Sequence, residues 1–348
     1  MTLYVDFQGQ LSGNIRMSSY TATFAVVLDV VSLNIMALVV VVESFRHHKK
    51  FIEMCYLLGK VDHSLRYQLG YGDQTKVLLV LSYMISLSVA SLVQEFYFEY
   101  EGRNSFVFYI PVFSLYCVEA ALFVQFTTMT QGIAARFRLI NDVIKKTVIS
   151  KSFGQLFRNQ SFVKISAIQV IYPPNHVADD NSCLSNLREL IDLYWLLCDA
   201  VQYANVFYGN QLLTTVFSGF AHIIITFYYL FLHLVPGQGS YLVIQGFWAI
   251  THISHLVLLV RPSTALTDAA NETAPIVCRL INRDLNSNVK KQLKEFLLQL
   301  IHHNAALSAR GVFPIHSHIL TSIAGSVTTY LVILIQFQTT PPTPGKVE

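Results

Sequence analysis

The sequence contains six long apolar segments, and they constrain its fold more than any other feature. A helix needs about 20 apolar residues to cross the ~30 Å hydrocarbon core of a bilayer. The segments that reach or approach this length are residues 22–42, 77–93, 106–126, 212–232, 241–260 and 319–337. Their apolar runs are continuous and do not alternate with polar residues, so they predict helices rather than barrel strands. We therefore expect an all-α, polytopic bundle of membrane helices.

The composition supports a membrane protein and excludes several other classes. Of the 348 residues, 53% are hydrophobic and only 13% are charged, whereas soluble domains have about 25% charged residues. A net charge of +3 is too small to indicate a nucleic-acid partner. The sequence contains no nucleophile elbow, phosphate-binding loop or zinc-type cysteine spacing. His252 and His255 have the spacing of a metal pair but lack a third ligand in the sequence. We expect no catalytic activity, no cofactor and no metal.

The distribution of Lys and Arg predicts the orientation. Residues 43–76, 127–211 and 261–318 contain 21 of the 24 basic residues, and only Arg16, Arg103 and Lys346 lie on the other side. Basic residues accumulate in cytoplasmic loops of membrane proteins. We therefore expect cytoplasmic helices in 131–211 and 261–318, membrane helices in 1–130 and 212–260, and a short extracellular tail in 338–348.

The long cytoplasmic segments have apolar residues at helical spacing. These residues predict amphipathic helices that continue the membrane helices and pack into a cytoplasmic domain, although helices lying on the lipid surface would have the same pattern. The residues are Phe137, Ile140, Ile144 and Val148; Leu190, Tyr194, Leu197, Cys198 and Val201; and Leu293, Phe296, Leu297, Leu300 and Ile301.

The last span has a polar stripe at steps of four and three residues: Ser322, Ser326, Thr329, Ile333 and Gln336. An unpaired amide in hydrocarbon costs about 4–8 kcal/mol, so this stripe must face water or another helix. One interpretation is a pore lining, in which Ile333 forms a hydrophobic constriction and Gln336 a hydrated ring beside it. The other is helix packing through small residues.

Polar and aromatic residues in other spans are candidates for a ligand pocket among the membrane helices. A charge near the middle of a bilayer costs about 2.5–3.5 kcal/mol, so Asp29 and Glu119 should face a cavity or a partner. Aromatic faces with a few polar groups suit small organic ligands. An interhelical hydrogen bond is the alternative for Asp29 and for His252. The other candidates are Tyr109 and Tyr116 in the third span, and Tyr241, Gln245 and Trp248 in the fifth.

The end of the last span resembles a known signature. Thr329-Tyr330, five hydrophobic residues and Gln336-Phe337 are similar to the C-terminal motif of insect gustatory receptors, which are related to insect odorant receptors. Ala309-Arg310-Gly311-Val312-Phe313, just before this span, also resembles that family. A basic-inside chain with an external C-terminus fits the same resemblance.

The resemblance implies a subunit of a tastant-gated, non-selective cation channel in the plasma membrane of gustatory neurons. It implies a homo- or heterotetramer with other gustatory receptors, held together by a cytoplasmic anchor and surrounded by membrane lipid. The last helices would line the central pore, and Ile333, Gln336 and Phe337 would occupy the gate region. A pocket open to the outside would bind a small-molecule tastant.

Two features depart from the family pattern. The family has seven spans and an internal N-terminus, whereas this sequence shows six and lacks the first. An incomplete gene model or a natural short form would explain this difference, and the second would put channel function in doubt. Many sugar receptors have Glu directly after the Thr-Tyr pair, where this sequence has Leu331, so we expect a bitter, aversive or other non-sugar ligand.

Three alternatives to a channel subunit stay open at this point. A secondary transporter would use Asp29 and Glu119 as a midplane substrate site. A G-protein-coupled receptor would have its C-terminus in the cytoplasm. The third alternative is a nonfunctional truncated receptor.

Overall fold

The protein is a bundle of long helices. The computed structural model describes residues 20–65, 82, 89, 106–158, 180–234, 239–283, 285–303 and 305–339. Its helices are α2 (Tyr20–Arg46), α3 (His48–Leu65), α5 (Phe106–Arg158), α6 (Asp180–Leu234), α7 (Gly239–Asn271), α8 (Thr273–Ile281), α9 (Ser287–His302) and α10 (His318–Thr339). Two short strands, β1 (Ser308–Ala309) and β2 (Phe313–Pro314), form an antiparallel hairpin between α9 and α10.

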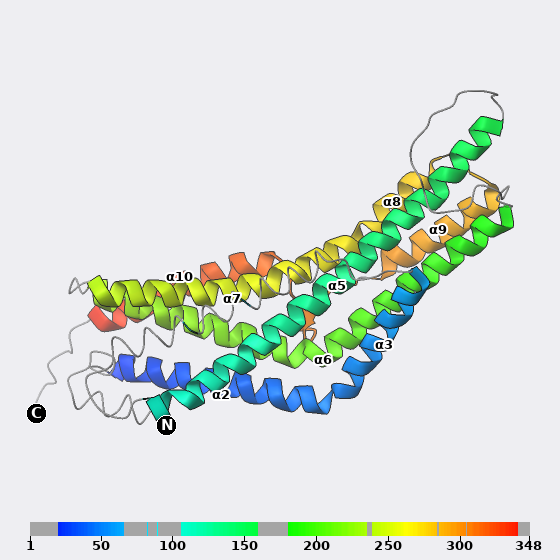
Figure 1. The fold of residues 1–348 in the computed structure, drawn as a ribbon. Helices are drawn as coiled ribbons and strands as arrows, with labels where there is room; N and C mark the ends of the chain where they lie inside the picture. The colour runs from blue at the N-terminus through cyan, green and yellow to red at the C-terminus, as the bar shows by residue number, and fades with distance from the viewer. Residues whose placement is uncertain are drawn as a thin grey trace, which may run out of the picture.

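Helices α5 and α6 run along the length of the elongated molecule (Figure 1). They contain 53 and 55 residues, so each is about 80 Å long at a rise of ~1.5 Å per residue. Only part of such a helix fits into a ~30 Å hydrocarbon core. The predicted spans 106–126 and 212–232 occupy one end of each helix, and the rest of the helix continues beyond them without a break.

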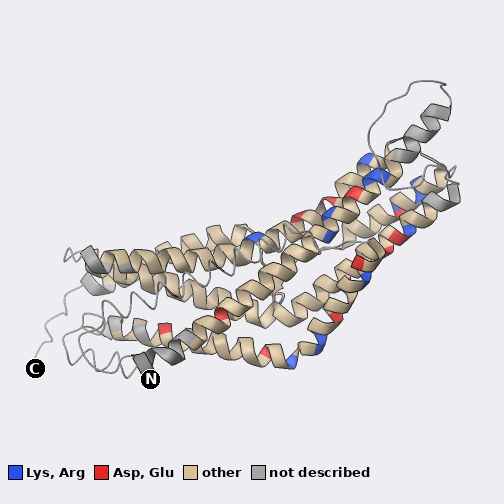
Figure 2. Ribbon diagram, viewed as in Figure 1, with Lys and Arg blue, Asp and Glu red and all other residues tan. Residues whose placement is uncertain are grey.

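Charge divides the molecule into two halves (Figure 2). We call α3, α8, α9, residues 127–158 of α5 and residues 180–211 of α6 the basic half, because Lys and Arg gather there. The apolar half comprises α2, α10 and the rest of α5, α6 and α7 up to residue 260. Apart from Arg46 at the end of α2, the described residues of the apolar half contain neither Lys nor Arg. The prediction that the basic segments are cytoplasmic depends on this separation of charged from apolar residues.

Packing in the basic half confirms the amphipathic pattern for most of its residues. Phe137, Ile140, Ile144 and Val148 are 0–1% exposed, and Leu293 and Phe296 are equally buried. These side chains lie in one continuous apolar core with residues of α3, α6 and α8. Ile301 is an exception, because its side chain is 67% exposed. The helices of this half therefore pack against one another.

Polar contacts complete the core of the basic half. Arg136 of α5 donates two hydrogen bonds to the carboxylate of Asp62 in α3, at 2.7 and 2.5 Å. Its side chain is almost completely buried, and such a bidentate pair fixes both the distance and the orientation of two helices. Asn141 of α5 donates to the carbonyl of Ala269 at 2.9 Å and accepts from the hydroxyl of Thr273 at 2.7 Å.

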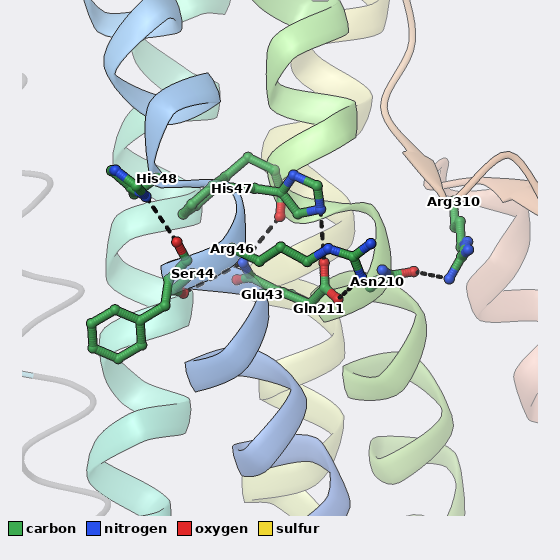
Figure 3. A network of polar contacts seen from close by, with 10 residues as sticks. Glu43, Ser44, Arg46, His47, His48, Asn210, Gln211 and Arg310 are labelled. Carbon is green, nitrogen blue, oxygen red and sulfur yellow. Dashed lines mark hydrogen bonds and ion pairs between the residues drawn. The ribbon is translucent and has the colours of Figure 1, made fainter.

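The chain turns between α2 and α3 at the boundary of the two halves (Figure 3). Glu43 is only 7% exposed, and its carboxylate oxygens lie 3.2 Å from His47 Nε2 and 3.8 Å from Arg46 Nη1. From α6, Gln211 donates to the hydroxyl of Ser44 at 3.5 Å. The first two contacts give the buried carboxylate a guanidinium and an imidazole as polar neighbours where the helix direction changes.

Three helices in the described part of the chain are long and apolar enough to cross a membrane: Thr23–Arg46, Leu184–Leu232 and His318–Gln336. They cover the predicted span 212–232 completely, and the predicted spans 22–42 and 319–337 except for residues 22 and 337. Spans 106–126 and 241–260 are helical, within α5 and α7, but are not among these three. The predicted span 77–93 lies outside the described residues, except for positions 82 and 89.

Candidate functional site

Helix α10 packs through one face and exposes the opposite face. Val327 is 8% exposed and lies in an apolar cluster with Ile223 of α6 and Leu256 of α7. One and two turns further along α10, Leu331 and Leu334 pack on a second apolar cluster, formed by Ala25 of α2 with Ile225, Tyr228 and Tyr229 of α6. These contacts cover one narrow strip of the helix, and only 6% of the apolar window of α10 is buried.

The polar stripe lies on the other face. Ser322, Ser326, Thr329 and Gln336 are all exposed, and Ile333 is 40% exposed. The hydroxyls of Ser322 and Thr329 donate to carbonyls one turn back, His318 at 3.3 Å and Gly325 at 3.1 Å. The stripe is therefore on the outer surface of the protomer, where a pore or another subunit could meet it. The side chain of Phe337 lies outside the described residues.

A second group of polar residues lies inside the apolar half. Asp29 of α2 faces His222 of α6, with Oδ1 3.4 Å from Nε2. His222 is 4% exposed, and its other nitrogen, Nδ1, lies 2.5 Å from the carbonyl oxygen of Ser218. A carbonyl can only accept, so Nδ1 donates its proton there. A hydrogen bond between Nε2 and Asp29 then requires a second proton, on the imidazole or on the carboxyl group.

Glu119 of α5 and His255 of α7 form the second acid–imidazole pair. Glu119 Oε1 lies 3.3 Å from His255 Nδ1, and both residues are buried. Within the described part of the chain, neither nitrogen of His255 makes a hydrogen bond of good geometry, so the two groups lie close together without one. The ring of Phe123 covers the imidazole at a centroid distance of 4.9 Å. His255 therefore has an apolar neighbour on one side and a carboxylate on another.

His252 joins the two pairs. Its ring lies 4.9 Å from that of His222 and 6.3 Å from that of His255, measured between centroids. Trp248, one turn earlier in α7, stacks on His252 at 5.6 Å with an interplanar angle of 19°. Tyr116 of α5 lies 5.7 Å from Trp248. The result is a row of aromatic rings that leads from Tyr116 to the three imidazoles.

These residues surround a cavity between α5, α6 and α7. Its volume is about 10 Å³, roughly the space that one water molecule requires. Ligand pockets for drug-sized molecules have ~300–1,000 Å³, so a ligand of that size would have to displace side chains here. The lining residues are Glu119, Phe123, Thr215, Gly219, His222, His252, His255 and Leu256.

The structure brings together most of the residues that the sequence suggested for the pocket. Asp29, Glu119, Tyr116, Trp248 and His252 lie in or beside this cluster, and Gln245 is half-buried one turn before Trp248. The side chains of Tyr109 and Tyr241 lie outside the described residues.

Sequence reasoning missed His222 and gave His255 no role in the pocket. An isolated histidine within an otherwise apolar span was the available signal for His222. Despite the three imidazoles and two carboxylates, no group of His, Cys, Asp or Glu among the described residues is arranged to hold a metal ion.

The model of the 7tm chemosensory receptor family matches residues 2–340. The chain belongs to this family. Gustatory receptor for sugar taste 43a of Drosophila melanogaster is 26% identical to the receptor, over 94% of this chain and 84% of that protein. Putative gustatory receptor 28b of the same species is 28% identical, over 46% of this chain and 36% of that protein. The resemblance to insect gustatory receptors is confirmed, and the receptor is a membrane protein rather than an enzyme.

Solved structures show the same fold. Insect olfactory receptor OR5 from Machilis hrabei superimposes on the receptor with a TM-score of 0.63, covering 92% of this chain and 83% of that chain at 13% identity. The same protein in complex with eugenol gives a TM-score of 0.61 at 12% identity. This similarity confirms the expected helical membrane fold. At this level of identity it shows the fold alone.

Proposed function

We propose that the receptor is one subunit of a tastant-gated, non-selective cation channel in the plasma membrane of gustatory neurons. Four such subunits, identical or related, would place their α10 helices around a central pore, with the basic half in the cytoplasm and the C-terminus outside. The observation that carries this proposal is the orientation of α10. Its apolar strip packs on its own bundle, and its polar stripe faces outward.

The cavity is the proposed tastant site, and its position suggests how it could act on the pore. Leu256 and His222 line the cavity, and Leu256 shares an apolar cluster with Val327 of α10. A ligand that enlarges the cavity must move side chains of α6 and α7, against which α10 packs. Preferential binding to such a conformation would shift the population toward an open pore. Ile333 would then leave the constriction that excludes water.

Two ligand classes are candidates, and one observation supports each. Leu331, where many sugar receptors have Glu, favours a bitter or other non-sugar compound. The identity of 26% with a sugar-taste receptor over 94% of the chain favours a sugar. The carboxylates of Asp29 and Glu119 would accept hydrogen bonds from sugar hydroxyls or pair with a cationic alkaloid beside Trp248. Calcium imaging of cells that express the receptor, with a sugar panel and an alkaloid panel, separates the two classes.

Whole-cell recording tests the channel proposal. Tastant-evoked current should persist when G-protein signalling is blocked, and loss of the current under that block would contradict the proposal. Saturable uptake of a tastant without a matching current would instead favour a secondary transporter. An epitope placed after Lys346 should be stained on intact cells. Staining only after permeabilisation would favour the topology of a G-protein-coupled receptor.

A further inference from the structure

A short segment connects the basic half to α10. We call residues 305–316 the strap. Its apolar side chains Ala305, Leu307, Ala309 and Ile315 are 0–3% exposed and belong to the main core. The strap therefore packs like a core element, although it contains only a two-stranded hairpin.

Asn205 of α6 holds the strap by two backbone groups at once. Its amide nitrogen donates to the carbonyl of Ala306 at 2.9 Å, and its side-chain oxygen accepts from the backbone N–H of Ser308 at 2.8 Å. One side chain thus satisfies an acceptor and a donor of the incoming strand. An aspartate or an alanine at position 205 could not make both bonds.

The next turn of α6 lets the hairpin approach closely. A Cβ atom on Gly209 would lie 3.3 Å from both the Cα and the backbone nitrogen of Arg310. Arg310 has a φ of 52°, a left-handed conformation that is uncommon for a residue with a side chain. Its guanidinium donates to Asn210 at 2.7 Å, as the right side of Figure 3 shows. The hairpin turn is thus held against α6 by backbone proximity and by a side-chain bond.

Helix α7 holds the other end of the strap. The hydroxyl of Ser263, which is completely buried, donates to the carbonyl of Ile315 at 2.6 Å. The N–H of Ile315 donates to Leu307 at 2.9 Å and closes the hairpin. His316 Nε2 lies 3.7 Å from Asp268 Oδ1 of α7. The end of the strap from which the chain continues into α10 is therefore fixed to α7, whereas the beginning of the strap is fixed to α6.

The strap is held much more firmly than α10, the helix that follows it. Only 6% of the apolar window of α10 is buried, so packing along the helix restrains it weakly, whereas the strap is buried and hydrogen-bonded on both sides. We propose that Asn205, with Gly209 and Ser263, is a positioning residue that transmits movements of α6 and α7 to the start of the pore helix. This inference rests on the proposed channel function for its gating consequence.

Three variants with matched controls test the inference. Asn205→Ala removes both strap bonds, and its control Asn288→Ala changes an exposed asparagine of α9. Ser263→Ala removes only one bond and disturbs the fold less, and its control is Ser254→Ala, whose hydroxyl bonds to Thr251 within its own helix at 2.7 Å. The third pair is Gly209→Ala against Gly59→Ala, because a Cβ atom at Gly59 would meet no described atom within 4 Å.

The first readout is backbone amide exchange of the full-length receptor in lipid nanodiscs. We expect exchange in residues 305–320 to accelerate about fivefold or more in Asn205→Ala and Ser263→Ala, the change that loss of one ordinary hydrogen bond produces. The controls should match the unmodified receptor. Unchanged exchange in all three strap variants would overturn the inference.

The second readout is basal Na⁺ current without tastant, normalised to the amount of receptor at the cell surface. A loosened strap should raise this current by about fivefold. Faster exchange with unchanged current in a receptor that conducts would overturn the gating consequence. If no variant conducts, including Ile333→Ser, the proposed channel function fails, and amide exchange alone decides whether the strap positions α10.

Discussion

Leu256 of α7 lines the polar cavity and lies in the same buried cluster as Val327 of α10. The residue therefore contacts both the proposed tastant site and the proposed pore helix. Close packing supports this position, because a Cβ atom on Gly219 of α6 would lie 3.2 Å from Leu256 Cδ2. A change in the shape of the cavity would thus reach α10 through one side chain.

Truncation of this side chain should destabilise the apolar half. We expect Leu256→Ala to lower the free energy of unfolding by about 2–5 kcal/mol, because it removes buried methyl groups and leaves a cavity. Ile250→Ala is the control, because Ile250 is 65% exposed on the same helix and should change stability by less than about 0.5 kcal/mol. Thermal unfolding in detergent measures both. Equal melting temperatures for the two variants would contradict the packing described above.

The contact between Asp29 and His222 should tolerate an amide better than an apolar residue. His222 Nδ1 donates to Ser218, so in the neutral ring Nε2 can accept a hydrogen bond from the side-chain amide that Asp29→Asn introduces. Asp29→Leu removes the polar partner of Nε2 and should cost about 1–3 kcal/mol, the penalty of an unsatisfied buried polar atom. Asp29→Asn should cost less, and melting temperatures of the two variants rank them. An exposed carboxylate, Asp142, offers the control Asp142→Asn. A lower melting temperature for Asp29→Asn than for Asp29→Leu would contradict this assignment of the imidazole protons.

Ile333 should limit basal conduction. Replacement of this apolar side chain by a hydroxyl lowers the barrier to hydration of a narrow constriction, so Ile333→Ser should increase basal cation current. Val332→Ser is the matched control, because Val332 is similarly exposed, 48% against 40%, but lies about 100° away around the helix. Patch recording at equal surface expression compares them. Equal leak in both variants would remove Ile333 from the gate.

Cysteine labelling should report the orientation of the basic half. Cys278 of α8 is exposed, whereas Cys55 of α3 is half-buried, and burial raises the pKa of the Cys55 thiol. The thiolate is the reactive form, so at neutral pH a maleimide should modify Cys278 faster than Cys55. Raising the pH above neutral should speed the modification of Cys55, because its thiolate fraction then increases.

A membrane-impermeant maleimide should label Cys278 only after permeabilisation, and Cys278→Ser should remove the faster part of the labelling that permeabilisation reveals. Labelling of Cys278 on intact cells would place the basic half outside and reverse the proposed orientation.

The periodicity of apolar residues predicted the helices of this receptor well, but it did not predict which helices contact each other. The spacing of Phe137, Ile140 and Ile144 placed them on one buried face because helix geometry alone determines that face. In contrast, the contact between Asp29 and His222 joins residues 193 positions apart, and no local pattern encodes it. The strap could not be predicted from the sequence pattern either. Its burial depends on two separate helices, and its hairpin depends on the left-handed conformation of Arg310. The signature in the last span identified the family, but it gave no information about the cavity.

The unbroken length of α5 and α6 has a mechanical consequence. Each helix passes from the cavity to the buried core of the opposite half without a joint, so its part beyond the cavity acts as a rigid lever of about 60 Å. A tilt of about 5° at the cavity would displace the inner end by roughly 5 Å. A small molecule that binds between α5 and α6 therefore needs to separate the helices only slightly at the cavity. The long helices convert this small change into a larger displacement at their ends in the basic half.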